Sequence, residues 1–202
     1  MSEWVALLRG INVGGVKVPG KELAALCTSL GLDAVRTVLA TGNVLFSSPR
    51  GADELRDQLE SALSERFGYD ARVVLLPRSR MAGVVAEYPF PEGPTHHAYA
   101  VFCSDPAVLA ALLDAAETAG VPPVPLPDAA HPAAAPGAGS TAPDTTDALD
   151  PGEERIAAGE GVVHWACPRG SSTGTPFSKL TSRAAFKAAL TTRNLNTVRK
   201  LF

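Results

Sequence analysis

Residues 35–46 read VRTVLATGNVLF and contain two short apolar runs separated by turn-forming residues. Val35 to Leu39 and Val44 to Phe46 have the length and the β-branched content expected of strands. The segment between them, Thr41 to Asn43, supplies the glycine and the asparagine that favour a tight turn with positive φ. This stretch therefore predicts a β-hairpin.

Two helices and two further strands are predicted around the hairpin. Apolar residues recur at helical spacing from Pro19 to Leu30 before it and from Ala52 to Phe67 after it. Continuous apolar runs predict outer strands from Trp4 to Leu8 and from Ala71 to Leu76. The order strand, helix, strand, strand, helix, strand is that of the split βαβ or ferredoxin-like motif.

The same order of elements starts again in the second part of the chain. The predicted elements are a strand at Tyr99 to Cys103, a helix at Pro106 to Ala119, a hairpin of Arg155 to Ala158 with Val162 to Ala166, and a helix at Ser178 to Leu190. We therefore predict an α+β protein of two ferredoxin-like halves, residues 1–77 and 97–202. A connecting helix and loop at 78–96 joins them.

The second half is interrupted by Val121 to Asp150, which holds seven prolines, eight alanines and two glycines. Such a composition, without hydrophobic periodicity, does not offset its ordering entropy by burial. We predict a flexible surface insertion at 121–150.

Overall composition predicts a globular protein of the cytoplasm. Of the 202 residues, 46% are hydrophobic, which is enough for a core, and no apolar run reaches membrane-spanning length. The N-terminus carries no secretory signal pattern. Three widely spaced cysteines, Cys27, Cys103 and Cys167, predict buried thiols and no disulfide framework.

The net charge of -3 conceals a segregation of charge along the chain. Residues 51–160 hold 18 acids against 6 Lys and Arg, whereas residues 161–202 hold 7 Lys and Arg and no acid. Residues 1–50 are mildly basic, so contact between the two ends would create one positive surface. This distribution favours a compact anionic partner over an extended nucleic acid, which usually requires a basic protein overall.

A glycine-rich motif lies near the N-terminus of the chain and a polar motif near its C-terminus. Arg9 to Gly15 reads RGINVGG and Thr191 to Val198 reads TTRNLNTV. Together with the Thr41 to Phe46 segment, they resemble the bacterial family designated domain of unknown function 1697. Its members open with an RGINVGG-like loop and close with a T-x-R-N-W-N-T-V-like segment. The resemblance implies an α+β protein of two similar halves; Leu195 stands where a tryptophan is usual.

The N-terminal motif is predicted to bind an anion, because it lies between a strand and a helix, where backbone N–H groups can hold one. Arg9 and Lys17 flank the loop, and Asn12 lies at its centre. The spacing fits neither a phosphate-binding P-loop nor a dinucleotide fingerprint. As an alternative, the glycines serve only a turn or a close packing contact.

The C-terminal motif places a bidentate donor, Arg193, beside Asn194, Asn196 and Thr197. As an alternative, Thr192 or Asn194 caps a terminal helix and Arg193 pairs with an acid. A third candidate is the hydroxyl-rich loop Arg169 to Thr175. It precedes a helix that Ser178 could cap, on which Lys179, Arg183 and Lys187 would share one face.

Metal and cofactor sites are not predicted. His164 and Cys167 lack a second ligand pair at suitable spacing, and the adjacent His96 and His97 point to opposite faces of an extended segment. A nucleophile elbow is also missing from the sequence. An enzyme using Ser171, Ser172 or Cys167 beside His164 remains an alternative.

The sequence thus predicts a protein that binds a small anionic ligand, such as a nucleotide or another phosphate compound, where its two end motifs meet. The predicted ligand-binding residues are Arg9, Gly10, Asn12, Gly14, Gly15, Lys17, Arg193, Asn194, Asn196 and Thr197. The alternatives are a transferase or hydrolase with His164 as base in the same pocket, and a protein-interaction module without a pocket. Sequence alone does not indicate the oligomeric state.

Overall fold

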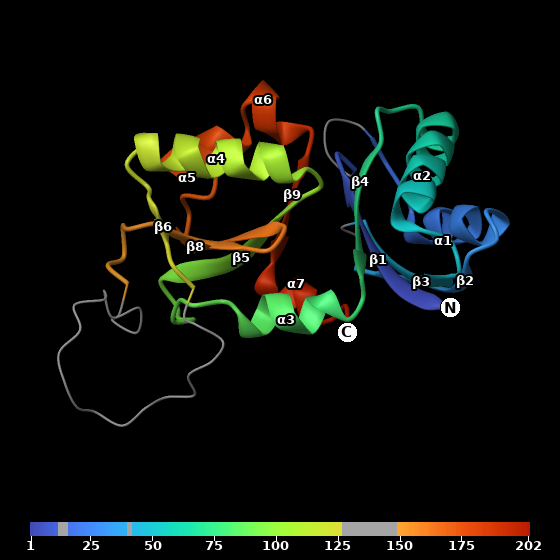
Figure 1. Cartoon of the computed structure of the whole chain (residues 1–202), viewed down its shortest axis with the longest axis horizontal. Helices are drawn as coiled ribbons and strands as arrows, with labels where there is room; N and C mark the ends of the chain where they lie inside the picture. The colour runs from blue at the N-terminus through green and yellow to red at the C-terminus, as the bar shows by residue number, and fades with distance from the viewer. Residues whose placement is uncertain (12–15, 40–41, 127–148) are drawn as a thin grey trace.

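A computed structural model describes residues 1–11, 16–39, 42–126 and 149–202. Helices and strands alternate along the chain and form two separate sheets, which confirms the predicted α+β class (Figure 1). None of the helices in the described part of the chain has the length and apolar character needed to span a bilayer.

The N-terminal sheet is antiparallel, with the strand order β2-β3-β1-β4. The elements of this half are β1 (Ser2–Arg9), α1 (Gly20–Ser29), β2 (Asp33–Val38), β3 (Asn43–Ser48), α2 (Ala52–Phe67) and β4 (Arg72–Pro77). The predicted hairpin is present, because β2 and β3 pair antiparallel. This half therefore has the split βαβ order predicted from the sequence.

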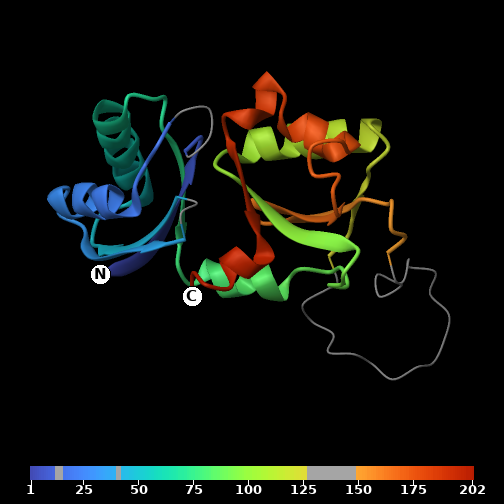
Figure 2. The ribbon, with the colours of Figure 1, turned by 180° about the vertical axis from the view of Figure 1, so that it is seen from behind.

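Both faces of the N-terminal sheet are covered, because apolar residues occupy both alternating sets of positions along β1. Ala6 and Leu8 pack with Val44 and Phe46 against α1 and α2. The two helices lie on the outer side of the sheet, away from the other half (Figure 2). The α2 helix ends at Gly68, whose φ of 69° is the left-handed conformation that favours glycine.

The C-terminal half repeats this architecture with one strand added. Its elements are β5 (His96–Cys103), α4 (Pro106–Thr118), β6 (Pro123–Val124), β7 (Arg155–Gly159), β8 (Val162–Pro168), α5 (Pro176–Thr181), α6 (Ala184–Lys187), β9 (Leu190–Asn194) and α7 (Leu195–Val198). The sheet order is β6-β7-β8-β5-β9. Without β6, the order β7-β8-β5-β9 corresponds strand for strand to β2-β3-β1-β4.

The prediction of one helix from Ser178 to Leu190 is wrong. The chain forms α5 and α6, separated by Arg183 in an extended conformation, and then enters β9. Hydroxyls of Thr181 and Ser182 accompany the break, since both donate to the carbonyl of Ser178, at 2.9 Å. The second half therefore contains a further strand, β9, that was not predicted from the sequence.

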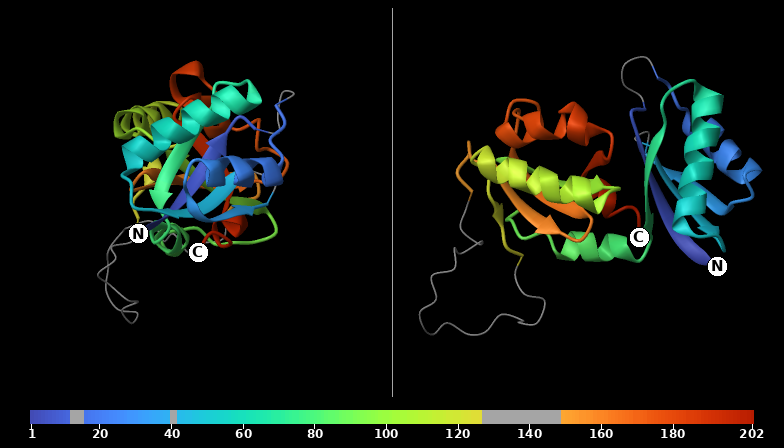
Figure 3. Two further views of the ribbon diagram at one scale, coloured as in Figure 1. Left: turned by 90° about the vertical axis from the view of Figure 1, so that its right-hand side faces the viewer. Right: turned by 45° about the horizontal axis from the view of Figure 1, so that its top comes forward.

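A shared apolar core joins the two halves. The connecting helix α3 (Arg80–Ala86) and the short α7 lie under the C-terminal sheet, while α4 to α6 cover its other face (Figure 1). Residues from both sheets, α3 and the C-terminus form this core: Val5, Leu7, Val38, Leu45, Val74, Met81, Val84, Ala100, Phe102, Val162, Val198 and Leu201. Two further views show the inner face of the N-terminal sheet turned toward the C-terminal half (Figure 3). The halves are thus packed together by side chains remote in sequence.

The predicted insertion at 121–150 is partly built into the fold. Val121 is buried in the core under α4, and β6 pairs with β7. Leu149 is buried beside Phe90. Residues 127–148, which form most of the predicted insertion, lie outside the described residues.

Candidate functional site

The C-terminal motif and the Thr41 to Phe46 segment meet at the side chain of Arg193, beside Leu8, the residue that precedes the N-terminal motif. Arg193 lies on β9, opposite Ala100 of β5, and its guanidinium extends across the boundary to the N-terminal sheet. Its Nε donates to Asn43 Oδ1 at 2.6 Å, and its Nη2 donates to the carbonyls of Leu8 at 2.7 Å and Gly42 at 3.4 Å. Its Nη1 donates to Thr191 Oγ1 at 2.7 Å and to the Thr192 carbonyl at 2.9 Å.

Local backbone geometry explains why these acceptors converge. The pairing of β1 with β3 ends at Leu7 and Asn43, and the Leu8 N–H makes a last bond to Gly42 O at 2.8 Å. Arg193 therefore occupies the end of this ladder. Gly42 has a φ of 70°, and a Cβ there would lie 2.6 Å from Ile11 Cδ1, so conformation and close packing both require glycine.

Asn43 is held as an acceptor for Arg193. Its side chain is fully buried, and Nδ2 donates to the carbonyl of Val38, its partner on β2, at 2.9 Å. The amide is thereby oriented with Oδ1 toward the guanidinium.

The electrostatic environment of Arg193 is unusual for a buried cation. The residue is 8% exposed, and no Asp or Glu in the described residues pairs with it. Burial lowers its pKa to about 10. The acid partner expected in the capping alternative is therefore missing within the described ranges. All the bonds of Arg193 named above go to protein oxygens, so a ligand would reach it only by replacing one of them.

Other residues predicted at the N-terminal motif are more exposed. Arg9 is half-buried at the end of β1, opposite Arg72 of β4, while Gly10 and Lys17 are exposed. Gly10 has a φ of 73°. Asn12, Gly14 and Gly15 lie outside the described residues.

The C-terminal motif turns from β9 into α7, and the capping interpretation of Asn194 is confirmed. Its Oδ1 accepts from the Asn196 N–H at 2.9 Å. Leu195, at the position of the family's tryptophan, is fully buried. Asn196 is exposed and its Oδ1 accepts from Arg199 Nη1 at 2.7 Å, while Thr197 is half-buried.

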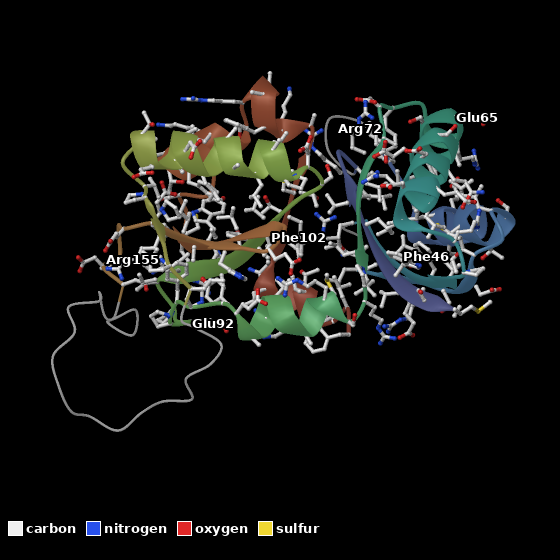
Figure 4. All side chains as sticks on the ribbon, in the orientation of Figure 1. Phe46, Glu65, Arg72, Glu92, Phe102 and Arg155 are labelled. Atoms are coloured by element: carbon white, nitrogen blue, oxygen red, sulfur yellow. The ribbon has the colours of Figure 1, made fainter. Side chains whose placement is uncertain are left out.

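Asn194 and Asn196 also line a pocket of about 270 Å³. Its other lining residues are Tyr88, Pro91, Glu92, Gly93, His96, His97, Ala98 and Arg169. The pocket forms where the beginning of β5 meets the ends of β8 and β9, because β5 runs antiparallel to both. Glu92 marks this end of the molecule in Figure 4, and Arg72 lies at the upper boundary between the halves. Neither Arg9, Gly10 nor Lys17 lines the pocket.

The carboxylate and amide oxygens of the side chains that line this pocket already accept hydrogen bonds from the protein. Arg199 holds Glu92 by an ion pair to both carboxylate oxygens, which keeps the pKa of Glu92 low. His96 is 6% exposed, and its ring nitrogens contact Thr95 Oγ1 at 3.0 Å and the Glu153 carbonyl at 2.8 Å. The Oδ1 atoms of both asparagines are bonded, as described above.

Hydrogen-bond donors in the pocket remain free. The guanidinium of Arg169 and the Nδ2 groups of Asn194 and Asn196 have no partner within the described part of the chain. Arg169 is exposed, and only its backbone N–H is bonded, to the Thr95 carbonyl at 3.0 Å. The polar groups left for a ligand are therefore mainly donors, one of them cationic.

The structure does not bring the alternative catalytic residues together. His164 is fully buried beneath the sheet, with Nε2 3.9 Å from Glu87 Oε2, and burial lowers its pKa to about 4. Cys167 lies three residues further along β8, in the core under α4 and α5, so the two side chains face opposite sides. All three cysteines are free and buried, as predicted.

The loop from Arg169 to Thr175 and the helix after it, the third predicted candidate, also differ from the prediction. Thr175, and not Ser178, caps α5, by accepting from the Ser178 N–H at 3.2 Å. Lys179 and Lys187 lie on different helices, with Arg183 in the break between them. The predicted shared basic face of one helix is therefore absent, although all three side chains are exposed. Within the described ranges, no group of three or more His, Cys, Asp or Glu residues could hold a metal ion.

Comparison with known proteins bears on this architecture. The model of a family described as protein of unknown function, DUF1697, matches residues 1–122. The chain belongs to this family. A conserved bacterial protein from Streptococcus pneumoniae, SP0830, has a similar solved structure, with a TM-score of 0.69 at 20% identity. That similarity covers 99% of this chain and 96% of the other, and it shows that the DUF1697 chain shares its fold. No curated protein matches the sequence.

Proposed function

We propose that this protein binds a small anionic ligand in the pocket lined by Arg169, Asn194 and Asn196. The observation that carries the proposal is the hydrogen-bond inventory of the pocket. The Glu92 carboxylate and the Oδ1 atoms of Asn194 and Asn196 are engaged by protein donors, whereas Arg169 and two amide Nδ2 groups have no protein acceptor in the described residues. A ligand that supplies only acceptors, such as a phosphate or carboxylate, complements this set.

Electrostatics supports the same ligand class. Among the described residues, Glu92 is the one carboxylate that lines the pocket, and Arg199 offsets its charge through a bidentate pair. Arg169 has no such partner within the described ranges. Ionised acceptors form shorter and stronger bonds to guanidinium than neutral acceptors do.

The binding position proposed here lies further along β9 than the position predicted from the sequence. Asn194 and Asn196 keep the binding role predicted for them, and Arg169 replaces Arg193 as the cation that contacts the anion. Arg193 is saturated by Leu8, Gly42 and Asn43 and acts by holding β9 against the N-terminal half.

The test is titration calorimetry with inorganic phosphate at low salt, comparing the unmodified protein with Arg169→Gln. The expected result is at least tenfold weaker binding in the variant, because hydrogen bonds to charged groups contribute roughly 1.5–3 kcal/mol. Arg183→Gln is the matched control, since Arg183 is exposed and does not line the pocket. Equal affinity in the two variants, or no binding of phosphate and simple carboxylates to the unmodified protein, would contradict the proposal.

A further inference from the structure

The pocket is continuous with a row of aromatic side chains that runs over the C-terminal sheet to α5. His97 lines the pocket, and its ring centroid lies 5.7 Å from that of Tyr99. Tyr99 in turn lies 5.2 Å from Trp165, with an interplanar angle of 32°, and Trp165 lies 5.5 Å from Phe177. Tyr99 is also the register partner of Asn194, a pocket residue. The aromatic row therefore starts at the free donors.

Accessibility changes along this row. His97 and Tyr99 are half-buried, whereas Trp165 is 4% exposed and Phe177 is fully buried. The row thus begins with accessible rings next to the pocket and ends in the core.

The Trp165 ring, against which Tyr99 packs, is itself held in place by hydrogen bonds and so restricts the orientation of the Tyr99 ring. Trp165, on which Tyr99 packs, donates from Nε1 to Glu154 Oε2 at 3.1 Å. The other oxygen of this carboxylate accepts from the Phe177 N–H at 2.8 Å. A ring held in this way loses little rotational freedom when a second ring stacks on it, which lowers the entropic cost of binding.

Pocket volume adds a constraint on the ligand. At about 270 Å³, the pocket lies just below the usual range of roughly 300–1,000 Å³ for sites that enclose a whole organic ligand. An anionic group fits inside, and the remainder of a larger molecule would extend outside, beside His97 and Tyr99.

We infer that the anionic ligand also carries a planar aromatic or heteroaromatic ring, which stacks on Tyr99 and His97 while its anionic group bonds to Arg169, Asn194 and Asn196. This inference rests on the proposed function. Both nucleoside monophosphates and aromatic carboxylates have the required chemistry.

Calorimetry with matched pairs of anions tests the inference and separates the two sources. Adenosine monophosphate is compared with ribose 5-phosphate, and benzoate with acetate, while inorganic phosphate reports on the donor pocket alone. At least one ring-bearing anion should bind about tenfold more tightly than its ringless counterpart, since stacking on an aromatic side chain contributes a factor of roughly 5 to 150. The pair that shows the difference identifies the source.

Variants at Tyr99 assign the effect to the ring. Tyr99→Leu should abolish the tenfold difference and leave the affinity for inorganic phosphate unchanged, which also shows that the pocket is intact. Tyr99→Phe keeps the ring and should preserve the difference. If Tyr99→Leu does not fold, Tyr99→Met supplies the same comparison, because it also removes the ring and lies outside the pocket lining.

Two outcomes would overturn the inference while the proposed function stands. One is phosphate binding without any advantage for ring-bearing anions, and the other is an advantage that persists in Tyr99→Leu. Failure of every anion to bind would overturn both proposals.

Discussion

Arg193 shows how a residue that looks suited to ligand binding can serve the fold. Its five hydrogen bonds reach two backbone carbonyls and an amide of the N-terminal half, and two oxygens of its own strand. A planar guanidinium with several donors in fixed directions can satisfy such a set, whereas the ammonium of lysine cannot. Sequence reasoning identified the unusual residue but not its acceptors, because these come from segments about 150 and 185 positions away.

Replacement of Arg193 is therefore expected to destabilise the protein. Arg193→Lys should lower the free energy of unfolding by about 2–4 kcal/mol, because buried acceptors lose their donors and the buried charge loses part of its hydrogen bonding. Urea denaturation followed by circular dichroism measures the change. Arg183→Lys, at an exposed position, should alter the free energy by less than about 0.5 kcal/mol. A comparable small effect for both variants would show that the Arg193 contacts carry little stability.

The Arg169 pocket was missed in the sequence for a related reason. His97 and Asn194 belong to different strands and Arg169 directly follows a third, so their proximity depends on the antiparallel pairing of β5 with β8 and β9. None of the three residues stands in a sequence motif that by itself indicates this pocket. A correct strand β9 would have placed its last residue beside the beginning of β5 and revealed the cluster.

At the scale of elements, hydrophobic periodicity predicted the N-terminal half and most of the C-terminal half. Strand β9 was not predicted because two of its inward-facing residues, Thr191 and Arg193, are polar. Both are buried, and both donate hydrogen bonds across the boundary between the halves. Periodicity detects apolar faces only. The predicted helix does not continue through Arg183. The hydroxyls of Thr181 and Ser182 donate to the carbonyl of Ser178, and such bonds compete with the regular helical hydrogen bonds.

The packing of α3 against the C-terminal sheet gives a prediction about pH. His164 of β8 is buried next to Glu87 and Tyr88, with Arg80 bonded to Glu87, and neither ring nitrogen has a hydrogen-bond partner among the described residues. Burial lowers its pKa from 6.5 to about 4, although the charge of Glu87 opposes the shift. Below pH 6.5, His164 is therefore protonated in the unfolded chain but stays neutral in the folded protein. The free energy of unfolding falls as the pH drops toward 4.

The expected loss from this one group reaches about 3 kcal/mol at pH 4. Unfolding by urea at several pH values between 4 and 7 measures it, with His164→Leu as the comparison. The variant should lose distinctly less stability over this interval than the unmodified protein. Parallel pH profiles would show that His164 titrates normally in the folded state.

At the scale of the whole molecule, the two halves repeat one topology, and a third apolar cluster, shared between them, joins their separate cores. Val5 and Leu7 of the first sheet, Phe102 of the second and Leu201 near the C-terminus belong to one buried cluster. Figure 4 shows Phe46 inside the N-terminal half and Phe102 where the halves meet. Burial of this shared cluster favours cooperative unfolding of both halves.

Two tryptophans allow a direct test of this cooperativity, since Trp4 lies in the N-terminal half and Trp165 in the C-terminal half. The single-tryptophan variants Trp165→Phe and Trp4→Phe should each show one urea transition, and the fluorescence midpoint should coincide with that from circular dichroism. Fluorescence midpoints that depart from the circular dichroism midpoint of the same variant would indicate that the halves unfold independently.

The most direct test of anion binding at the donor pocket is a two-dimensional ¹H-¹⁵N NMR titration of the protein with inorganic phosphate. The side-chain signals of Asn194 and Asn196 and the Nε–H of Arg169 should shift together in a saturable manner. The Nε–H of Arg193 and the amide of Asn43 should change little, because the protein already satisfies them. Shifts centred on Arg193, Arg9 and Lys17, or no saturable shift at the two asparagines and Arg169, would contradict the account.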